Sequence, residues 1–105
     1  MTKRYTSLLA VALSLAACDG DREAAARMFA EQADRCLLAV RDHGARFEAS
    51  RECLPLRSLS MAYINAGGGR EESPTRHRLL YEQGRASAWA ALAISRSGDP
   101  SLSLW

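Results

Sequence analysis

Residues 21–43, DREAAARMFAEQADRCLLAVRDH, decide the fold, because they predict one long amphipathic helix. Apolar residues recur there at steps of three and four, which is the period of one face of an α-helix. Asp19 or Asp21 can cap the start of this helix, and Gly44 follows its last residue as a helix stop. The expected buried stripe contains Ala25, Met28 or Phe29, Ala33, Cys36 and Val40, with Leu37 at its edge.

Two further helices are expected after Gly44. Residues 45–65 keep a helical pattern that Pro55 interrupts, because its ring lacks an N–H and clashes with the preceding turn. Residues 66–73 contain three consecutive glycines and are typical of a flexible linker. Ser73 and Pro74 then predict the cap and first residue of a helix over 74–97. Its expected apolar face contains Leu79, Leu80, Ala86, Trp89, Ala90, Ala93 and Ile94.

The composition favours an all-helical fold. After residue 17, the β-branched residues that strands prefer are limited to Val40, Thr75, Ile64 and Ile94, whereas alanine occurs 15 times. We therefore expect an all-α, small three-helix domain, in which a helical hairpin is stapled by one disulfide and joined by a third helix. A core this rich in alanine is thin, and domains of this size commonly need a covalent staple.

The staple is expected between Cys36 and Cys53. Gly44 lies about midway between them, so a hairpin that folds there brings the two thiols level. A crosslink over such a loop contributes about 3 kcal/mol in the chain-entropy estimate. A catalytic thiol, a redox pair and a metal site are the alternatives. The pair is not a Cys-x-x-Cys motif, and His43 and His77 are the only imidazoles, so we expect no metal site.

The segment 1–17 has the features of a secretory signal. Lys3 and Arg4 precede a short apolar run that ends in small residues. Asp19 and Asp21 follow before the run reaches the ~20 apolar residues that a membrane-spanning helix needs, so we expect no permanent transmembrane helix. The net charge of +2 belongs to this segment, because 12 basic and 12 acidic residues remain in 18–105.

The end of this segment, Leu15-Ala16-Ala17-Cys18, resembles the lipobox of bacterial lipoproteins. The resemblance implies that Cys18 receives a diacylglyceryl thioether, that the signal is cleaved after residue 17, and that 18–105 is the mature lipid-anchored domain. Asp19 resembles the sorting signal that retains lipoproteins of enteric bacteria in the inner membrane. The resemblance therefore places the protein in the cell envelope, facing the periplasm, with the inner membrane favoured and the outer membrane open. An ordinary signal peptide before an unmodified cysteine is the alternative.

No motif predicts catalysis, and we do not expect an enzyme. The glycines at 67–69 lack the Lys-Ser/Thr of a phosphate loop. Glu71 and Glu72 are expected as a solvated pair in the linker. Arg76-His77-Arg78 is expected as a solvated helix face, with lipid headgroups as the alternative contact. A balanced charge gives no reason to expect nucleic acid as a partner, and no cofactor is expected apart from the lipid on Cys18.

A protein-binding role remains. Tyr81, Trp89 and Trp105 are the candidate contact residues, because large aromatic side chains supply much of the binding energy at interfaces. For Trp89, burial in the core is the favoured alternative. The size, the lipobox and the cysteine pair resemble those of small entry-exclusion lipoproteins of conjugative elements. That resemblance implies a membrane-tethered accessory factor of a conjugation or secretion system. The alternative function is a periplasmic inhibitor or accessory factor of an envelope hydrolase.

Overall fold

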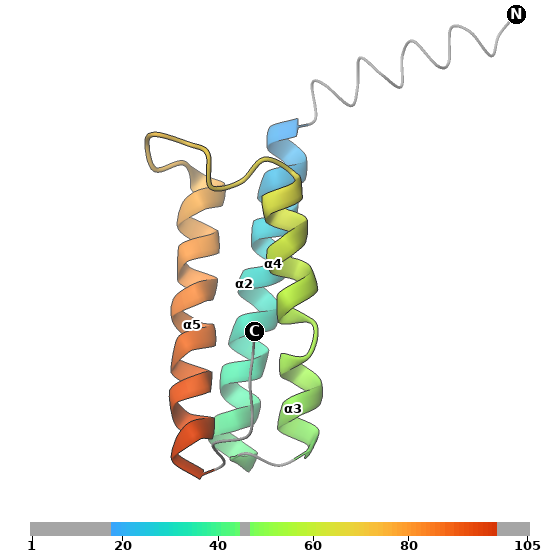
Figure 1. The fold of residues 1–105 in the computed structure, drawn as a ribbon, viewed down its shortest axis with the longest axis vertical. Helices are drawn as coiled ribbons and strands as arrows, with labels where there is room; N and C mark the ends of the chain where they lie inside the picture. The colour runs from blue at the N-terminus through green and yellow to red at the C-terminus, as the bar shows by residue number, and fades with distance from the viewer. Residues whose placement is uncertain (1–17, 45–46, 99–105) are drawn as a thin grey trace, which may run out of the picture.

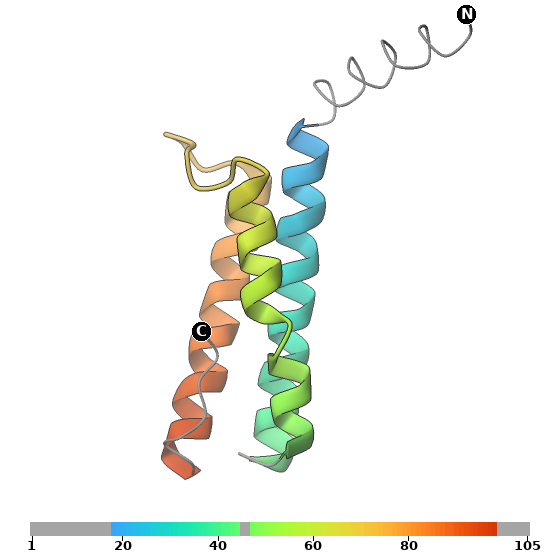
Figure 2. The ribbon, with the colours of Figure 1, turned by 45° about the vertical axis from the view of Figure 1, so that its right-hand side comes forward.

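Four helical segments form the part of the chain that the computed structural model describes, residues 18–44 and 47–98 (Figure 1). They are α2 (Cys18–His43), α3 (Phe47–Cys53), α4 (Leu56–Asn65) and α5 (Arg76–Gly98), and this part of the chain contains no strand. Figures 1 and 2 show α3 and α4 end to end beside α2, with α5 along another side of α2. The described residues therefore form a three-helix, all-α bundle, as the sequence predicts.

The ends of α2 and α5 follow local signals in the sequence. Gly44 adopts a φ of 67°, which glycine tolerates without a Cβ clash, and its N–H donates to the Val40 carbonyl at 2.7 Å. This contact ends α2 at His43, as predicted, although α2 begins three residues before the predicted start at Asp21. α5 begins at Arg76, two residues later than predicted.

The predicted interruption at Pro55 is confirmed. The N–H of Leu54 still donates to the Ser50 carbonyl at 2.9 Å, which continues the turn of α3. Pro55 has no N–H to donate, but its carbonyl accepts from the Leu59 N–H at 3.0 Å and so starts α4. One helical side of the bundle is therefore built from two short helices instead of one.

The disulfide Cys36–Cys53 joins α2 to α3. Its two Cα atoms lie 4.8 Å apart, and both residues are buried, with 0% and 3% exposed surface. This confirms the predicted pairing and its place beside the hairpin turn. Buried disulfides of this kind are typical of an oxidising compartment outside the cytoplasm.

The helix α2 lies at the centre, since it packs extensively against α5, α3 and α4. Its contact with α5 uses mostly small residues, Ala30 and Ala33 on α2 and Gly84, Ala88 and Ala91 on α5. A Cβ at Gly84 would lie 2.8 Å from Cδ1 of Phe29 and 2.9 Å from Cα of Ala30. The two backbones therefore approach closely at this position.

The close contact turns α5 away from the predicted orientation. Four members of its expected apolar face are exposed: Leu79, Ala86, Trp89 and Ala93. From the sequence we expect the largest apolar residues of α5 against the core, whereas the interface with α2 contains small residues that permit close approach of the two helices. On α2 the choice between Met28 and Phe29 is resolved, because Phe29 is fully buried and Met28 is 56% exposed.

Candidate functional site

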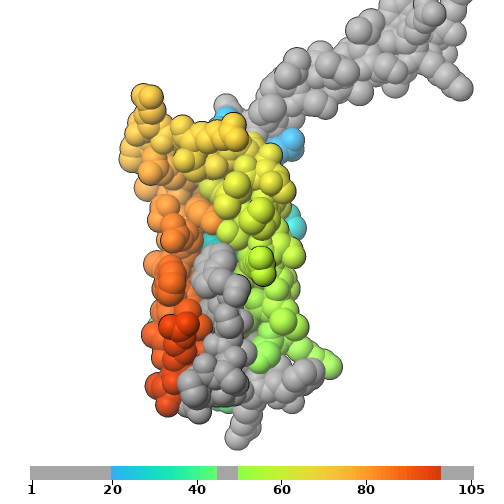
Figure 3. Space-filling model, in the orientation of Figure 1, coloured from blue at the N-terminus to red at the C-terminus, as the bar shows by residue number. Residues whose placement is uncertain are grey.

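A groove of about 680 Å³ separates α4 from α5. Four residues of α4 and three of α5 line it: Arg57, Ser60, Met61, Ile64, Tyr81, Arg85 and Trp89. Figure 3 shows α5 on the left and α4 on the right of this side of the molecule. The groove is the larger of the two hollows described here. The other, of about 370 Å³, lies beside the end of α2 and is lined by Arg35, Leu38, Ala39, His43 and Glu52.

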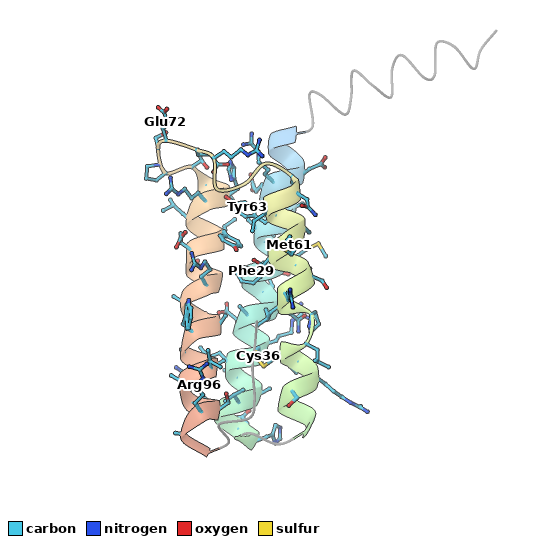
Figure 4. All side chains as sticks on the ribbon, in the orientation of Figure 1. Phe29, Cys36, Met61, Tyr63, Glu72 and Arg96 are labelled. Atoms are coloured by element: carbon cyan, nitrogen blue, oxygen red, sulfur yellow. A yellow bond between two sulfur atoms is a disulfide. The ribbon has the colours of Figure 1, made fainter. Side chains whose placement is uncertain are left out.

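The groove exists because both helices direct other residues toward α2. α4 buries Leu56, Ser60 and Tyr63, while its Met61 and Ile64 remain 46% and 47% exposed. On α5, the small residues toward α2 leave Trp89 half exposed. Figure 4 shows Phe29 and Tyr63 inside the bundle and Met61 on α4. Large apolar side chains of two helices are therefore left at one surface.

Three aromatic rings, those of Phe29, Tyr63 and Tyr81, pack together beneath the groove. Tyr63 and Tyr81 stack with their ring centroids 4.2 Å apart, and the ring centroid of Phe29 lies 4.9 Å from that of Tyr81. The hydroxyls of Ser60 and Tyr81 share a hydrogen bond of 2.5 Å across the gap between α4 and α5. Packing and hydrogen bonding together fix the position of Tyr81.

Two arginines give the groove its charge. Arg57 on α4 and Arg85 on α5 are exposed at its rim, and neither pairs with an acidic side chain among the residues described. An exposed guanidinium can bind a carboxylate or stack on an aromatic ring. The groove therefore combines an apolar, aromatic lining with two exposed cations, which suits binding of a protein segment.

A buried polar network occupies the end of the bundle where α2 begins. The Glu71 carboxylate accepts from Arg22 of α2 at 3.0 Å and from the Gly69 N–H at 2.9 Å, and its Oε1 lies 3.4 Å from Nδ1 of His77. Hydrogen bonds join His77 to Tyr63 at 3.2 Å and to Thr75 at 2.9 Å. The network fastens the α4–α5 connection to α2.

The surroundings of Glu71 and Tyr63 shift both of their pKa values. Burial alone would raise the pKa of Glu71, but hydrogen bonds from the backbone N–H groups of Glu71 and Gly69, with the charges of His77 and Arg22, lower it overall. Burial and then the Glu71 charge raise the pKa of the Tyr63 phenol. At neutral pH the Glu71 carboxyl group is therefore ionised and the Tyr63 phenol is protonated. We interpret the network as structural.

Two predictions made from the sequence are corrected by this network. Glu71 is not part of a solvated pair, since its side chain is only 10% exposed, whereas its neighbour Glu72 is exposed as expected. His77 is 7% exposed and does not lie on a solvated face, although Arg76 beside it is exposed and pairs with Glu23 at 3.2 Å. The segment 66–73 is thus tied to the bundle by its own hydrogen bonds.

The three predicted contact residues, Tyr81, Trp89 and Trp105, do not all lie at one described site. Tyr81 and Trp89 line the same groove, and the favoured burial of Trp89 in the core is wrong because the residue is 50% exposed. Trp105 and the whole segment 1–17 lie outside the described residues. Cys18 is the first residue of α2. Cys36 and Cys53 are consumed by the disulfide, and no group of three or more His, Cys, Asp or Glu side chains within 18–44 and 47–98 could hold a metal ion.

The α4 side of the groove was not predicted from the sequence. Arg57, Met61 and Ile64 recur at steps of four and three, which places them on one face of α4 beside the buried face that contains Leu56 and Tyr63. The two apolar residues of this second face, Met61 and Ile64, are a signal that can be found in the sequence. It predicts a helix with more apolar surface than a single neighbour can cover.

Comparison with known proteins finds no match for this chain. No protein-family model matches the chain, and neither a curated protein nor a solved structure is similar enough to count as a match. Among the described helices, none has both the length and the apolar character required to cross a bilayer.

Proposed function

We propose that this protein is a small bacterial envelope lipoprotein that is anchored through Cys18 and acts by binding an envelope protein. The observation that carries the binding role is the groove between α4 and α5. Met61, Ile64 and Trp89 are about half exposed there, beside the two exposed arginines Arg57 and Arg85. Contiguous apolar surface with a polar rim is typical of an interaction site.

The anchor is supported by the sequence at residues 15–18 and by the disulfide. A lipobox directs a protein to the outer side of the cytoplasmic membrane, where thiols are oxidised. The Cys36–Cys53 disulfide agrees with that compartment. Two or three acyl chains on one cysteine suffice for stable anchoring, whereas a single chain binds a bilayer only marginally.

The position of Cys18 determines how the groove would sit relative to the membrane. α2 begins at Cys18, so no spacer separates the lipid attachment from the bundle. Phe29, whose ring packs on Tyr81 in the floor of the groove, lies about 16 Å further along α2 at 1.5 Å per residue. A partner in or near the same membrane is therefore within reach, as suits an accessory factor of a conjugation or secretion system of the entry-exclusion type.

Binding is favoured over catalysis by the chemistry of the groove. Among the described residues that line it, the two hydroxyl groups, on Ser60 and Tyr81, are bonded to each other, and none supplies a carboxylate, an imidazole or a thiol. These described residues thus offer no acid–base pair for proton transfer. We assign no catalytic residue and no cofactor other than the lipid on Cys18.

The test uses a photo-crosslinking amino acid in the full chain, expressed in cells and analysed in their membranes. Met61, in the groove, is the test position, and Leu79, which is 61% exposed on α5 outside the groove lining, is the control. We expect one dominant adduct from Met61 and none from Leu79, with a component of a transport or secretion complex as the captured protein. A hydrolase as the captured protein would support the inhibitor function instead. Equal or absent adducts at both positions would contradict the binding role.

A further inference from the structure

The groove between α4 and α5 carries charge of one sign. Among the described residues that line it, only Arg57 and Arg85 are charged, and they belong to opposite walls. Arg57 is also the only charged residue of α4. We propose that the groove binds an amphipathic helix of the partner protein, with an apolar stripe that faces the groove and carboxylates on both flanks of that stripe. This inference rests on the proposed binding function and adds the shape and charge of the bound segment.

The bundle has room for another helix at this place. α4 and α5 each pack extensively against α2, whereas their packing against each other is slight. Tyr81 of α5 connects the two helices, since its ring stacks on Tyr63 and its hydroxyl shares a hydrogen bond with Ser60. A helix that lies over these side chains contacts α4 and α5 together and adds a fourth member to the bundle.

The length of the groove corresponds to two helical turns. The lining residues extend from Arg57 to Ile64 on α4, about 11 Å, and from Tyr81 to Trp89 on α5, about 12 Å at 1.5 Å per residue. Two turns of an α-helix also span about 11 Å. The apolar stripe of the bound segment would therefore consist of residues at i, i+3 or i+4, and i+7.

The walls of the groove favour a helix over an extended segment. Both walls are α-helices, whose backbone N–H and C=O groups bond within each helix, so the walls offer no sheet edge. An extended segment would leave its own backbone groups unpaired against Met61, Ile64 and Trp89, which costs free energy. A helix satisfies these groups internally and presents only side chains to the groove.

The two arginines select the charge of the bound helix. A helix whose apolar stripe faces the groove turns one flank toward α4 and the other toward α5. Arg57 and Arg85 are exposed on these two sides, and a guanidinium binds a carboxylate in bidentate geometry. A basic helix of the same shape would place like charges side by side, which opposes binding.

The test uses synthetic peptides of about 18 residues, because much shorter helices are marginal in water. Two peptides share one apolar stripe and carry either Glu or Lys on both flanks, and a third has the Glu flanks and a central proline that breaks the helix. The full chain, in a mild detergent, carries isotope-labelled methionine methyl groups. The Glu peptide should shift the Met61 signal and bind about tenfold more tightly than the other two. Met28, exposed on α2 outside the groove lining, should keep its signal.

A charge-reversal variant tests the two arginines directly. In Arg57→Glu/Arg85→Glu the preference should invert, with the Glu peptide bound about tenfold more weakly and the Lys peptide more tightly by a similar factor. Tighter binding of the Lys peptide cannot result from a loss of folding. Arg41→Glu/Arg96→Glu is the matched control, because both residues are exposed outside the groove lining and the net charge changes equally. It should keep the wild-type preference.

Three results would overturn the inference. They are equal binding of the Glu and Lys peptides, equal binding of the proline peptide, and an unchanged preference in the charge-reversal variant. Contacts of Met61 only with detergent or with a second copy of the chain would do the same. The proposed function is tested separately, because the crosslink from Met61 in membranes captures a partner of any shape or charge. An adduct there without a peptide preference would leave the binding role intact and refute only the acidic helix.

The converse result is equally informative. A peptide preference that inverts with Arg57 and Arg85, in the absence of an adduct at Met61, would support the acidic-helix specificity of the groove and contradict the proposed role in the envelope.

Discussion

At the scale of single residues, Glu71 joins three parts of the chain. Its carboxylate meets Arg22 near the start of α2 and His77 near the start of α5, and the Gly69 N–H donates to it from the connecting turn. The Arg78 guanidinium also donates to the Glu71 carbonyl at 2.7 Å. One acidic residue therefore fixes how the α4–α5 connection closes the end of the bundle.

Replacement of Glu71 by Gln should lower the free energy of unfolding by about 1–2 kcal/mol at neutral pH. The amide keeps the shape of the side chain but removes the charge that Arg22 faces, and hydrogen bonds to charged groups are worth more than neutral ones. Chemical unfolding followed by circular dichroism measures the change. Glu72→Gln, at the exposed neighbouring position, should leave the stability unchanged. Equal effects of the two substitutions would contradict the role given to Glu71.

The lowered pKa of Glu71 predicts an acid-sensitive contribution to stability. A carboxyl group whose pKa is lower in the folded protein stabilises the fold above its unfolded pKa, near the usual 4.5. This contribution is lost as the pH falls below 4.5 through the folded value. The wild-type protein should therefore lose part of its stability over this acid range, and the slope should be smaller in Glu71→Gln. Parallel stability curves for the two proteins would show that another group causes the loss.

The lipid anchor makes a prediction for Cys18 alone. Cys18→Ser replaces the thiol that forms the thioether, because a hydroxyl is a far weaker nucleophile than a thiolate. The variant should no longer incorporate labelled palmitate and should keep residues 1–17. The double variant Cys36→Ala/Cys53→Ala should incorporate palmitate as the wild type does. Incorporation that persists in Cys18→Ser would show that the proposed anchor is wrong.

At the scale of helices, the contact of α2 with α5 depends on the absence of a side chain at Gly84. Gly84→Ala should lower the free energy of unfolding by about 1–3 kcal/mol, because a methyl group meets both Phe29 and the Ala30 backbone. Gly20→Ala is the matched control, since nothing lies within 4 Å of a Cβ there. In an open helical position alanine is the better helix former, so the control should be neutral or more stable. A stabilising Gly84→Ala would contradict the close packing.

The helices and their disulfide could be predicted because their signals are local. Gly44 and Pro55 mark breaks wherever the rest of the chain lies, and the position of Gly44 between the two cysteines follows from the sequence alone. The face of α5 that packs against α2 could not be predicted in this way. Hydropathy favours Trp89 for burial, whereas the approach of two backbones favours Ala88 and Ala91, and only the packed structure decides between them.

The groove escaped prediction for a related reason. Tyr81 and Trp89 were identified as aromatic candidates, but their common site depends on α4, which the sequence places nearby without giving its rotation. Glu71 was missed because adjacent acidic residues in a glycine-rich stretch are usually solvated. Its burial follows from Arg22, which comes from a helix 49 residues away.

At the scale of the whole molecule, the disulfide decides whether the bundle unfolds as one unit. α3 has seven residues, too few for a stable isolated helix. Apart from the disulfide, a hydrogen bond from the Gln32 amide to the Glu52 carbonyl at 2.5 Å joins α3 to α2. By contrast, α5 is held along its length by the small-residue contact and by a hydrogen bond from Ser87 to Asp34 at 2.6 Å.

Removal of the disulfide should therefore loosen α3 first. In Cys36→Ala/Cys53→Ala the free energy of unfolding should fall by about 3 kcal/mol, the chain-entropy value for a loop of this size. Hydrogen exchange should show lost protection in α3 while the middle of α2 and α5 keeps its protection, because the close approach of Gly84 to Phe29 and Ala30 lies about 9 Å along α2 from Cys36. Reduction of the wild-type protein should reproduce this pattern. Equal loss of protection in all helices would mean that the α2–α5 pair is not stable without α3. The helices would then unfold as a single cooperative unit.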